Sequence, residues 1–242
     1  MNGENIGVRF HQKSSVSRNK TGGLRLQVGQ KGKEEREGER VIISLSQPGL
    51  SQSSLEKTIA DRRSCRTFSD QPLSFDHLST LLWAAQGVTG YHHGRPLRSA
   101  PSGGGRYPFD LYLFIHKAEV LSPGLYLYKP RLHAVQQIRL GSFSEQLSTI
   151  GLEQELFHSA GAVFVLAAEF ERICSKYGER GYRYVYMEAG HISQNIALEV
   201  TSLGVGSVPV GAFYDGDLNQ LIGLDGEKHA AIYMHAVGTL SE

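Results

Sequence analysis

One long helix, predicted over residues 181–202, constrains the fold more than any other feature of the sequence. Apolar side chains recur along it at spacings of three and four residues and form one face, made by Val185, Ala189, Ile192, Ile196 and Val200. The other faces carry further apolar side chains, those of Tyr186, Met187 and Leu198. A helix that is apolar on more than one side lies either at the centre of a fold or in a subunit interface.

The other predicted elements indicate an α+β fold. Helices are predicted to begin near Ser53, where Glu56 completes a capping box, and at Ser74, and to cover 142–156 and 216–222. Strand patterns occupy the segments 110–116, 124–130, 133–140, 162–169, 206–210 and 230–238. These elements do not alternate regularly as βαβ units, which argues against a doubly wound parallel sheet.

The chain is predicted to form one folded domain, 41–242, preceded by an N-terminal arm, 1–40. The arm has little apolar periodicity and finishes in "QKGKEEREGER", which buries too little surface to offset the entropy of ordering it. We therefore expect a loosely ordered arm. From "VIISL" (41–45) onward, no linker or internal repeat interrupts the sequence.

Charge and cysteine content argue against several function classes. The formal net charge is +1, so no overall field would attract nucleic acid or an anionic membrane, and the longest apolar run, 160–168, is too short to cross a bilayer. Cys65 and Cys174 are far apart, and the ten histidines show no metal-ligand spacing, so neither a disulfide framework nor a metal site is expected. These features predict a cytoplasmic protein without a metal, nucleic acid or membrane partner.

A first candidate binding segment is "RRSCRTF" (62–68), which supplies Arg62, Arg63, Ser64 and Arg66 just beyond a predicted helix end. Guanidinium forks and a hydroxyl suit a phosphomonoester, which offers nearly two negative charges and three acceptor oxygens. The alternative is a solvated basic helix end, because arginine is usually exposed.

A second candidate is "LRSAPSGGGRYPFDLYLF" (97–114), which sets a Pro-Ser turn and three glycines directly before a strand pattern. Backbone amides left free by glycine can hydrogen-bond the polar edge of a flat ligand, while Pro101 fixes the turn and Ser102 adds a hydroxyl. The alternative is an ordinary turn at the entry of a strand. Neither GxGxxG nor GxxxxGK[ST] is present, so the sequence does not predict a dinucleotide fold or a P-loop.

Five motifs in this order resemble the SagB-type dehydrogenase branch of the flavin-dependent nitroreductase family: "RRSCRTF", "APSGGGRYP", "GLYLYKPRLH", "KYGERGYRYVYMEAGHISQN" and "GVGSVPVGAF". The resemblance extends from about 41 to 238, and "FHQKSS" (10–15) is similar to the His-containing entry segment of that branch. It implies a nitroreductase-like fold, with a central, mostly antiparallel sheet flanked by helices and a long central helix. It also implies an FMN enzyme that forms a homodimer with two flavins at the subunit interface.

The resemblance also implies roles for the two candidate segments. Arg62, Arg63, Ser64 and Arg66 would hold the phosphate and ribityl chain of FMN. Pro101, Ser102 and Gly103 would border the isoalloxazine, often from the partner subunit. A flavin ring against this loop would account for its glycines, because a Cβ there would intrude on the ring.

A third matching motif is "VPVGA" (208–212), which resembles the loop beneath the flavin. There a backbone N–H reaches the N5 edge, and the matching residues are Pro209, Val210, Gly211 and Ala212. A buried strand followed by a glycine turn is the alternative. The chain departs from many relatives after its final "VG", where "TLSE" lacks the basic residue that helps to bind phosphate.

The resemblance implies a catalytic pair as well. In azoline-oxidising relatives a Lys-Tyr pair at a similar position is associated with removing the substrate proton, which implies that role for Lys176 and Tyr177. A solvated loop pair is the alternative. Arg180 and Arg183 nearby could also simply pair with Glu179 and Glu188.

Three more residues of the long helix are expected to be structural. We expect Gly190 to permit close helix packing, and His191 and Asn195 to support the fold.

Two classes of function remain open at this point. The first is FMN-dependent redox catalysis on a small molecule or a modified peptide. It would be either oxidation of an azoline by hydride transfer to flavin N5, or reduction of nitro or quinone compounds by NAD(P)H. The second is a non-catalytic module that binds FMN or a peptide. Lys176 and Tyr177 favour the first class, and the missing basic residue after Gly238 keeps the second open.

Overall fold

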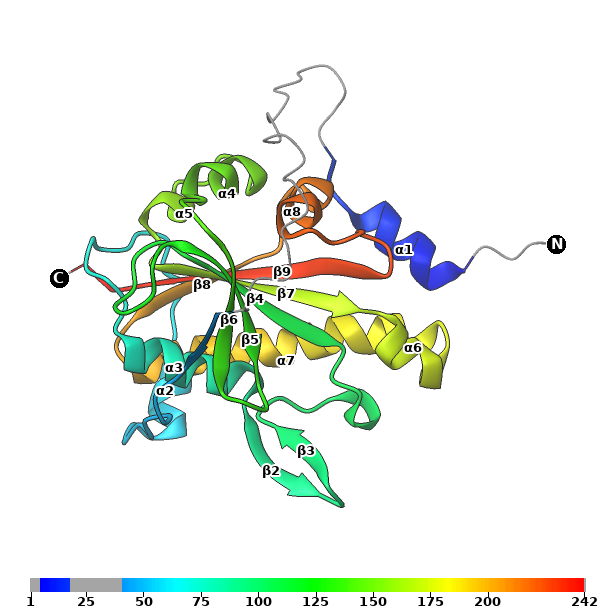
Figure 1. The fold of residues 1–242 in the computed structure, drawn as a ribbon, viewed down its shortest axis with the longest axis horizontal. Coiled ribbons are helices and arrows are strands. Elements are labelled where there is room, and N and C mark those ends of the chain that lie inside the picture. Colours follow the sequence, from blue (N-terminus) through cyan, green and yellow to red (C-terminus); the bar gives the residue numbers. More distant parts are fainter. Residues whose placement is uncertain (1–4, 18–40, 242) are drawn as a thin grey trace.

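The computed structural model describes residues 5–17 and 41–241 (Figure 1). Its helices are α1 (Ile6–Ser14), α2 (Leu55–Asp61), α3 (Phe75–Gln86), α4 (Ser144–Ile150), α5 (Leu156–Ser159), α6 (Glu171–Tyr177), α7 (Arg180–Ser202) and α8 (Asp215–Ile222), with a 3₁₀ turn η1 (Gly103–Gly105). Its strands are β1 (Ile42–Ser44), β2 (Val88–His92), β3 (Arg95–Arg98), β4 (Phe109–Ile115), β5 (Gly124–Lys129), β6 (Ala134–Leu140), β7 (Ala162–Glu169), β8 (Gly206–Val210) and β9 (His229–Gly238).

A seven-stranded sheet in the order β1-β6-β5-β4-β7-β9-β8 forms the centre of the molecule. Every neighbouring pair in it is antiparallel. Strand β7 lies inside the sheet between β4 and β9 and nearly all of its residues are buried, as expected for a strand with helices on both faces. Strands β2 and β3 form a separate hairpin. The prediction of an α+β fold with a mostly antiparallel sheet is confirmed.

Helices cover both faces of the sheet (Figure 1). One core lies between the sheet and helices α3 and α7, and the other lies between the sheet and helices α4, α5 and α8. Alternate residues of one strand serve the two cores, because successive side chains of a strand point to opposite faces. Leu113 and Ile115 of β4 face the first core, and Phe114 between them faces the second.

Helix α7 has the central position that its apolar pattern predicts. Val185, Ile192 and Ile196 are fully buried against the sheet. The Ser193 hydroxyl lies 2.9 Å from Nδ1 of His235 in β9, and Nε2 of this ring lies 2.9 Å from the hydroxyl of Ser207 in β8. Burial lowers the pKa of His235 to about 3, so this bridge between α7, β9 and β8 is neutral at physiological pH.

The predicted helix over 142–156 is divided into α4 and α5. Leu152 and Glu153 between them have φ values of 63° and 57°, a left-handed conformation that a continuous helix does not contain. Gly151 is required here, because a Cβ would overlap the Phe157 ring. This break, α6 and the β2–β3 hairpin were not predicted from the sequence, and the cap of α2 is Ser54 and not the predicted Ser53.

Helix α1 lies within the segment that was predicted to be a loosely ordered arm. Asn5 caps it by accepting a hydrogen bond from the Val8 amide, and His11 is buried with Nδ1 3.1 Å from the Tyr186 hydroxyl of α7. Val16 donates its amide to the Asp215 carboxylate at 2.7 Å. Residues 18–40 lie outside the described part of the chain, so the prediction for them stays a prediction.

A membrane span would need a long, apolar helix, and no helix within residues 5–17 and 41–241 meets that requirement.

Candidate functional site

The arginine segment, residues 62–66, follows α2 and lies along the edge strand β8. The Cys65 amide donates to the Ser207 carbonyl at 2.8 Å, and Gly206 allows this approach because a Cβ there would lie 3.1 Å from the Cys65 side chain. The side chain of Ser64 is exposed. The segment is therefore held by its backbone, which leaves side chains available.

The three arginines of the segment differ in their surroundings. The Arg63 guanidinium donates to the Ala60 and Arg62 carbonyls, both at 2.8 Å, and so caps the end of α2. Arg66 is exposed and Arg62 is half-buried, and neither forms an ion pair with another described residue. Arg62 and Arg66 are thus the cations of this segment that can meet an anion.

Strand β8 brings the "VPVGA" motif to the end of the same sheet edge. Val210 is buried in the second core and Pro209 is half-buried, and proline is tolerated here because β8 is an edge strand. Gly211 and Ala212 are exposed beyond the strand end. A cavity of about 360 Å³ adjoins Gly211 and is bordered by Phe10 and His11 of α1 and by Tyr186 of α7.

The glycine loop, residues 101–107, lies against α6 and brings the predicted catalytic pair next to it. Gly104 and Gly105 have φ values of 61° and 64°, a conformation that glycine adopts without strain. A Cβ at Gly104 would lie 2.6 Å from both Lys176 Nζ and the Tyr177 hydroxyl. The structure therefore gives a reason for Gly104 within this chain, besides the flavin contact that the resemblance implies.

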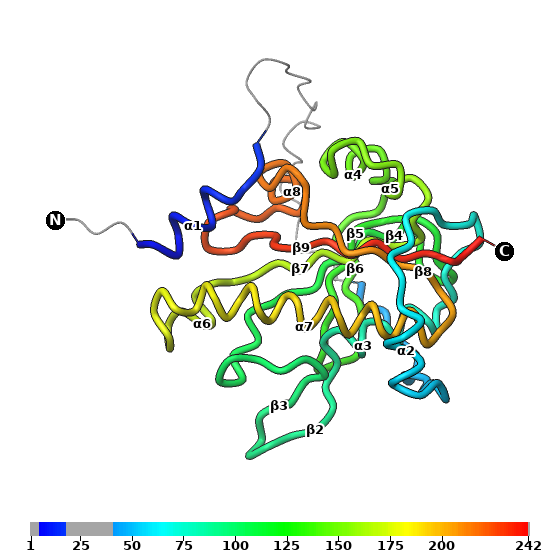
Figure 2. Tube along the Cα trace, turned by 180° about the vertical axis from the view of Figure 1, so that it is seen from behind, coloured from blue at the N-terminus to red at the C-terminus, as the bar shows by residue number. Residues whose placement is uncertain are grey.

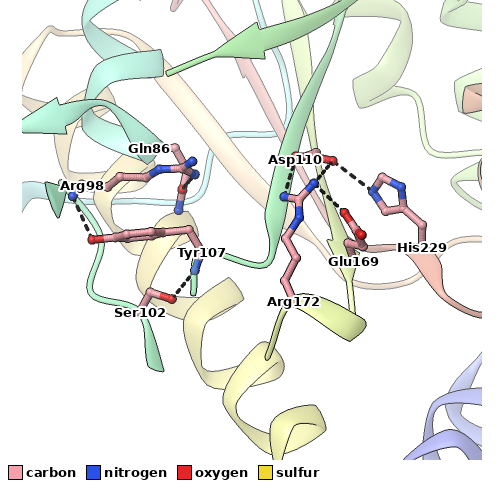
Figure 3. A network of polar contacts seen from close by, with 8 residues as sticks. All are labelled: Gln86, Arg98, Ser102, Tyr107, Asp110, Glu169, Arg172 and His229. Carbon is pink, nitrogen blue, oxygen red and sulfur yellow. Dashed lines mark hydrogen bonds and ion pairs between the residues drawn. The ribbon is translucent and has the colours of Figure 1, made fainter. Parts of the chain in front are cut away.

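A hydrogen-bonded network fixes the loop to the β2–β3 hairpin (Figure 3). The Tyr107 amide donates to the Ser102 hydroxyl at 2.7 Å, and the Arg98 amide donates to the Tyr107 hydroxyl at 3.1 Å. The Arg98 guanidinium lies 4.7 Å from the centre of the Tyr107 ring and donates to Gln86 Oε1 at 2.7 Å. The loop that carries the predicted site residues Pro101, Ser102 and Gly103 is therefore held in one conformation.

Glu188 of α7 is buried beneath this loop with 2% of its surface exposed. Neither carboxylate oxygen has a hydrogen-bond partner among the described residues. Burial raises the pKa of Glu188 to about 7, and the nearby Ser102 hydroxyl, the Gly103 amide and the positive charge of Arg98 partly oppose that shift. A buried carboxyl group that changes charge near neutral pH is typical of functional sites.

The arginine segment and the glycine loop are separated within one chain (Figure 2). Helix α7 has 23 residues and is therefore about 34 Å long. The glycine loop packs near its N-terminal end, where Gly103 approaches Tyr184. The arginine segment and β8 lie at its C-terminal end, together with α2. A single chain thus brings Arg62 and Arg66 together with β8, and brings Gly103 together with Lys176 and Tyr177.

The sequence analysis missed Glu188, Arg98 and Tyr107 as members of the site. The sequence pattern could have indicated Glu188. It lies three residues after Val185 and four before Ile192, so it interrupts the apolar face of the helix. An ion pair between Arg183 and Glu188, which the sequence left open, is absent from the described contacts, because Arg183 points to solvent and Glu188 to the interior.

The three residues of α7 that were expected to be structural have different surroundings. Asn195 does support the fold by donating to the Ala84 carbonyl of α3 at 3.1 Å. A Cβ at Gly190 would meet no atom of the described residues within 4 Å, so the close helix packing expected of it is not seen within one chain. His191 is exposed.

Comparison with known proteins identifies the family. The nitroreductase family model matches residues 59–239. This chain belongs to the nitroreductase family. A protein of Methanocaldococcus jannaschii named as a nitroreductase is 37% identical over 185 residues, which cover 76% of this chain and 91% of that protein. A crystal structure from Anabaena variabilis named as a nitroreductase has a TM-score of 0.72 and 27% identity over 84% of this chain. This chain spans only 42% of that longer one.

Two further similarities are to Escherichia coli proteins named for microcin B17. The microcin B17-processing protein McbC of Escherichia coli is 26% identical over 154 residues, covering 62% of this chain and 57% of McbC. The E. coli microcin synthetase McbBCD complex with bound truncated pro-MccB17 contains a chain of the same fold, with a TM-score of 0.69, 21% identity, and coverage of 98% of this chain and 92% of that one.

A cofactor is named for another structure of this fold. The nitroreductase-like structure from Desulfovibrio desulfuricans was solved in complex with FMN. It has a TM-score of 0.57 and 17% identity, and it covers 79% of this chain and 89% of that one.

We predict that Glu188 makes the free energy of unfolding depend on pH. Its pKa is about 7 in the folded protein and about 4.3 in an unfolded chain, so the folded state binds the extra proton between these values. The contribution of Glu188 to the free energy of unfolding should therefore be greatest below pH 4.3. It should fall by on the order of 3 kcal/mol as the pH rises to about 7. Glu188→Gln should lack this decrease.

Urea unfolding of wild type and Glu188→Gln between pH 4.5 and 8 measures this difference. The comparison with the variant cancels the contributions of other buried groups such as His116 and His235, and the exposed Glu227→Gln serves as a control for the loss of one carboxylate. Parallel curves for wild type and Glu188→Gln would contradict the prediction.

Proposed function

We propose that this nitroreductase-family protein binds FMN and oxidises an azoline ring, or a similar substrate, in the manner of a SagB-type dehydrogenase. The observation that supports it most strongly is that Lys176 Nζ and the Tyr177 hydroxyl lie close to Gly104, in the loop expected to border the flavin. The 26% identity to McbC, which is named as a processing protein for microcin B17, supports a peptide substrate.

The chain has groups that fit FMN. Arg62 and Arg66 lack ion-pair partners among the described residues and lie beside the exposed Ser64, so they can hold a phosphate. Pro209, Val210, Gly211 and Ala212 follow on the same side of the fold and would lie under the ring. When bound, FMN would supply a two-electron acceptor at N5.

Lys176 and Tyr177 would manage the proton of this reaction. Dehydrogenation of an azoline removes one hydrogen with its electron pair and another as a proton, so the enzyme needs a base. The Lys176 ammonium nitrogen lies 5.2 Å from the centre of the Tyr177 ring, and both groups face Gly104. In this proposal Lys176 acts as the neutral amine and accepts the proton, and the Tyr177 hydroxyl orients the substrate or relays the proton.

A homodimer would complete the site. In one chain the arginine segment and the glycine loop lie at opposite ends of α7, so a flavin that contacts both requires a second chain. The solvent-facing side of α7 offers a surface for this, with Met187 54% exposed and Gly190 open to close approach by another helix. Pro101, Ser102 and Gly103 of one subunit would then border the flavin held by Arg66 of the other.

A second candidate function is reduction of nitro or quinone compounds by NAD(P)H. It is favoured by the 37% identity to the M. jannaschii protein named as a nitroreductase.

A non-catalytic flavin-binding module is the third candidate. The segment after Gly238 supports it. Many relatives have a basic residue in this segment, whereas this chain has Leu240, which packs against Gly206. Both cysteines are free thiols, which suits the cytoplasmic location that we propose.

We predict that Arg66→Ala weakens binding of FMN more than binding of riboflavin, because only FMN carries the phosphate. Loss of a hydrogen bond to a charged group corresponds to roughly 10- to 150-fold in dissociation constant. Arg63→Ala is the matched control and should have a smaller effect, since its guanidinium already caps α2. Fluorescence titration gives the dissociation constants of FMN and riboflavin for the wild type and both variants. Equal losses of affinity for the two flavins in Arg66→Ala would show that Arg66 does not contact the phosphate.

Replacing the proposed proton-transfer pair should lower turnover without loss of flavin. Lys176→Ala and Tyr177→Phe are each expected to reduce azoline oxidation by about 10²-fold or more, the usual scale for loss of a general base. The flavin absorbance per chain should stay constant. If both variants oxidise the azoline peptide at the wild-type rate, or if the wild type reduces a nitroaromatic compound and never oxidises an azoline, the reductase function replaces this proposal.

Mixed dimers test whether each site is shared between chains. A dimer of one Arg66→Ala chain and one Lys176→Ala chain has one site with both changes and one with neither, provided that Arg66 and Lys176 of a site come from different chains. Such dimers, purified with two affinity tags, should recover about half of the wild-type turnover, a value set by that site count. Recovery no greater than that of the two parent variants would show that each site lies within a single chain.

A further inference from the structure

A basic cleft of about 720 Å³ lies beside the glycine loop and is separate from the arginine segment. Strand β3, the glycine loop, the turn after β5 and helix α6 all contribute to its lining. Its basic side chains are those of Lys176 and of five arginines, Arg95, Arg98, Arg106, Arg131 and Arg172. The whole chain carries a formal net charge of only +1, so this concentration of positive charge is local.

One of these arginines is already neutralised within the protein. Arg172 donates to both carboxylate oxygens of Asp110 at 2.8 and 3.0 Å, and it pairs with Glu169 at 2.6 Å (Figure 3). Such a bidentate pair fixes the guanidinium in place. Arg172 therefore shapes the wall of the cleft and leaves the other cations to meet a ligand.

Arg98 is only partly satisfied. It donates to Gln86, which is neutral, and its Nε is buried without a hydrogen-bond partner among the described residues. Burial lowers the pKa of Arg98, and the negative charges of Asp110 and Glu188 oppose that shift only in part. A negative charge in the cleft would stabilise this guanidinium.

Arg95, Arg106 and Arg131 are exposed, and none of them forms an ion pair or hydrogen bond with another described side chain. They come from separate segments of the chain and meet only in the fold. Glu171 is the remaining acidic residue of the lining, since Glu169 is engaged by Arg172. Like charges gathered in this way repel one another unless an anion lies between them.

We propose that the basic cleft binds the anionic part of the substrate, a phosphate-type or carboxylate group with at least two negative charges. Lys176 belongs both to the cleft and to the pair at Gly104, so a ligand anchored there lies next to the proposed base. This inference rests on the proposed function in taking that pair as the reacting centre. The volume suits an extended ligand better than a single ion.

Two kinds of substrate carry this chemistry, namely the pyrophosphate of a nicotinamide dinucleotide and the acidic side chains of a modified peptide. Arginine forks recognise both groups through paired hydrogen bonds. The experiment must therefore first locate the anion and then identify its source.

Calorimetric titration of the FMN-saturated protein with inorganic pyrophosphate at low ionic strength locates the site. Arg106→Gln and Arg131→Gln should each weaken binding about tenfold, the lower end of the range for a charge-assisted hydrogen bond, and added salt should weaken it further. Arg139→Gln, an exposed arginine of β6 outside the cleft, should bind as the wild type does. Absence of pyrophosphate binding, or unchanged binding by both cleft variants, overturns the proposal.

Competition then identifies the source of the anion. NADH, NADPH and a synthetic peptide with three aspartates are each tested for displacement of pyrophosphate, with a peptide carrying asparagines in their place as the neutral control. Displacement by the dinucleotides or by the acidic peptide supports the cleft as a substrate site, and displacement by none of them overturns it. Bound FMN, measured separately by its absorbance, tests the proposed function, so the two proposals can fail independently.

Discussion

The burial of α7 against the sheet determines where both parts of the candidate site lie. Val185, Ile192 and Ile196 remove one whole face of the helix from water, which is the dominant favourable term in folding. The Ser193–His235–Ser207 contacts then fix the rotation of the helix relative to β9 and β8. With the helix held in this way, the glycine loop and α6 pack at its beginning and the arginine segment packs at its end.

Glu188 shows how this burial acts on chemistry. The helix places its carboxyl group in the apolar interface beneath Ser102 and Gly103, where water cannot solvate the charge. The free energy that the apolar face supplies allows the fold to retain a group that is unfavourable there when ionised. The glycine loop is thus in contact with a protonation site on its inner side and with Lys176 and Tyr177 on its outer side.

Positive charge is distributed in two places in a nearly neutral chain. The arginine segment offers Arg62 and Arg66 beside β8, and the basic cleft gathers arginines from β3, the glycine loop and the turn after β5. Asp110 and Glu169 neutralise Arg172 in the wall of the cleft, whereas Arg95, Arg106 and Arg131 remain exposed. An anion would therefore be attracted by these two local fields and not by the charge of the whole protein.

Local sequence determined the elements whose pattern is strong. The periodicity of α7, the capping serine of α3 and the apolar run of β7 each predicted an element within about one residue of its observed bounds, because side-chain period and capping act over a few residues. The motif order also indicated the nitroreductase family and, with it, the arginine segment, the glycine loop and the Lys176–Tyr177 pair. These features depend on residues that are neighbours in the chain.

Only the tertiary structure decided which of these segments meet. The close contact of Gly104 with Lys176 and Tyr177 joins residues about 70 positions apart, and the basic cleft joins four segments, so no local pattern could reveal either. The burial of Glu188 likewise depends on what covers the helix at that point, and the separation of the arginine segment from the glycine loop depends on the length of α7. Sequence determined the chemical groups, and packing over long sequence distances determined their partners.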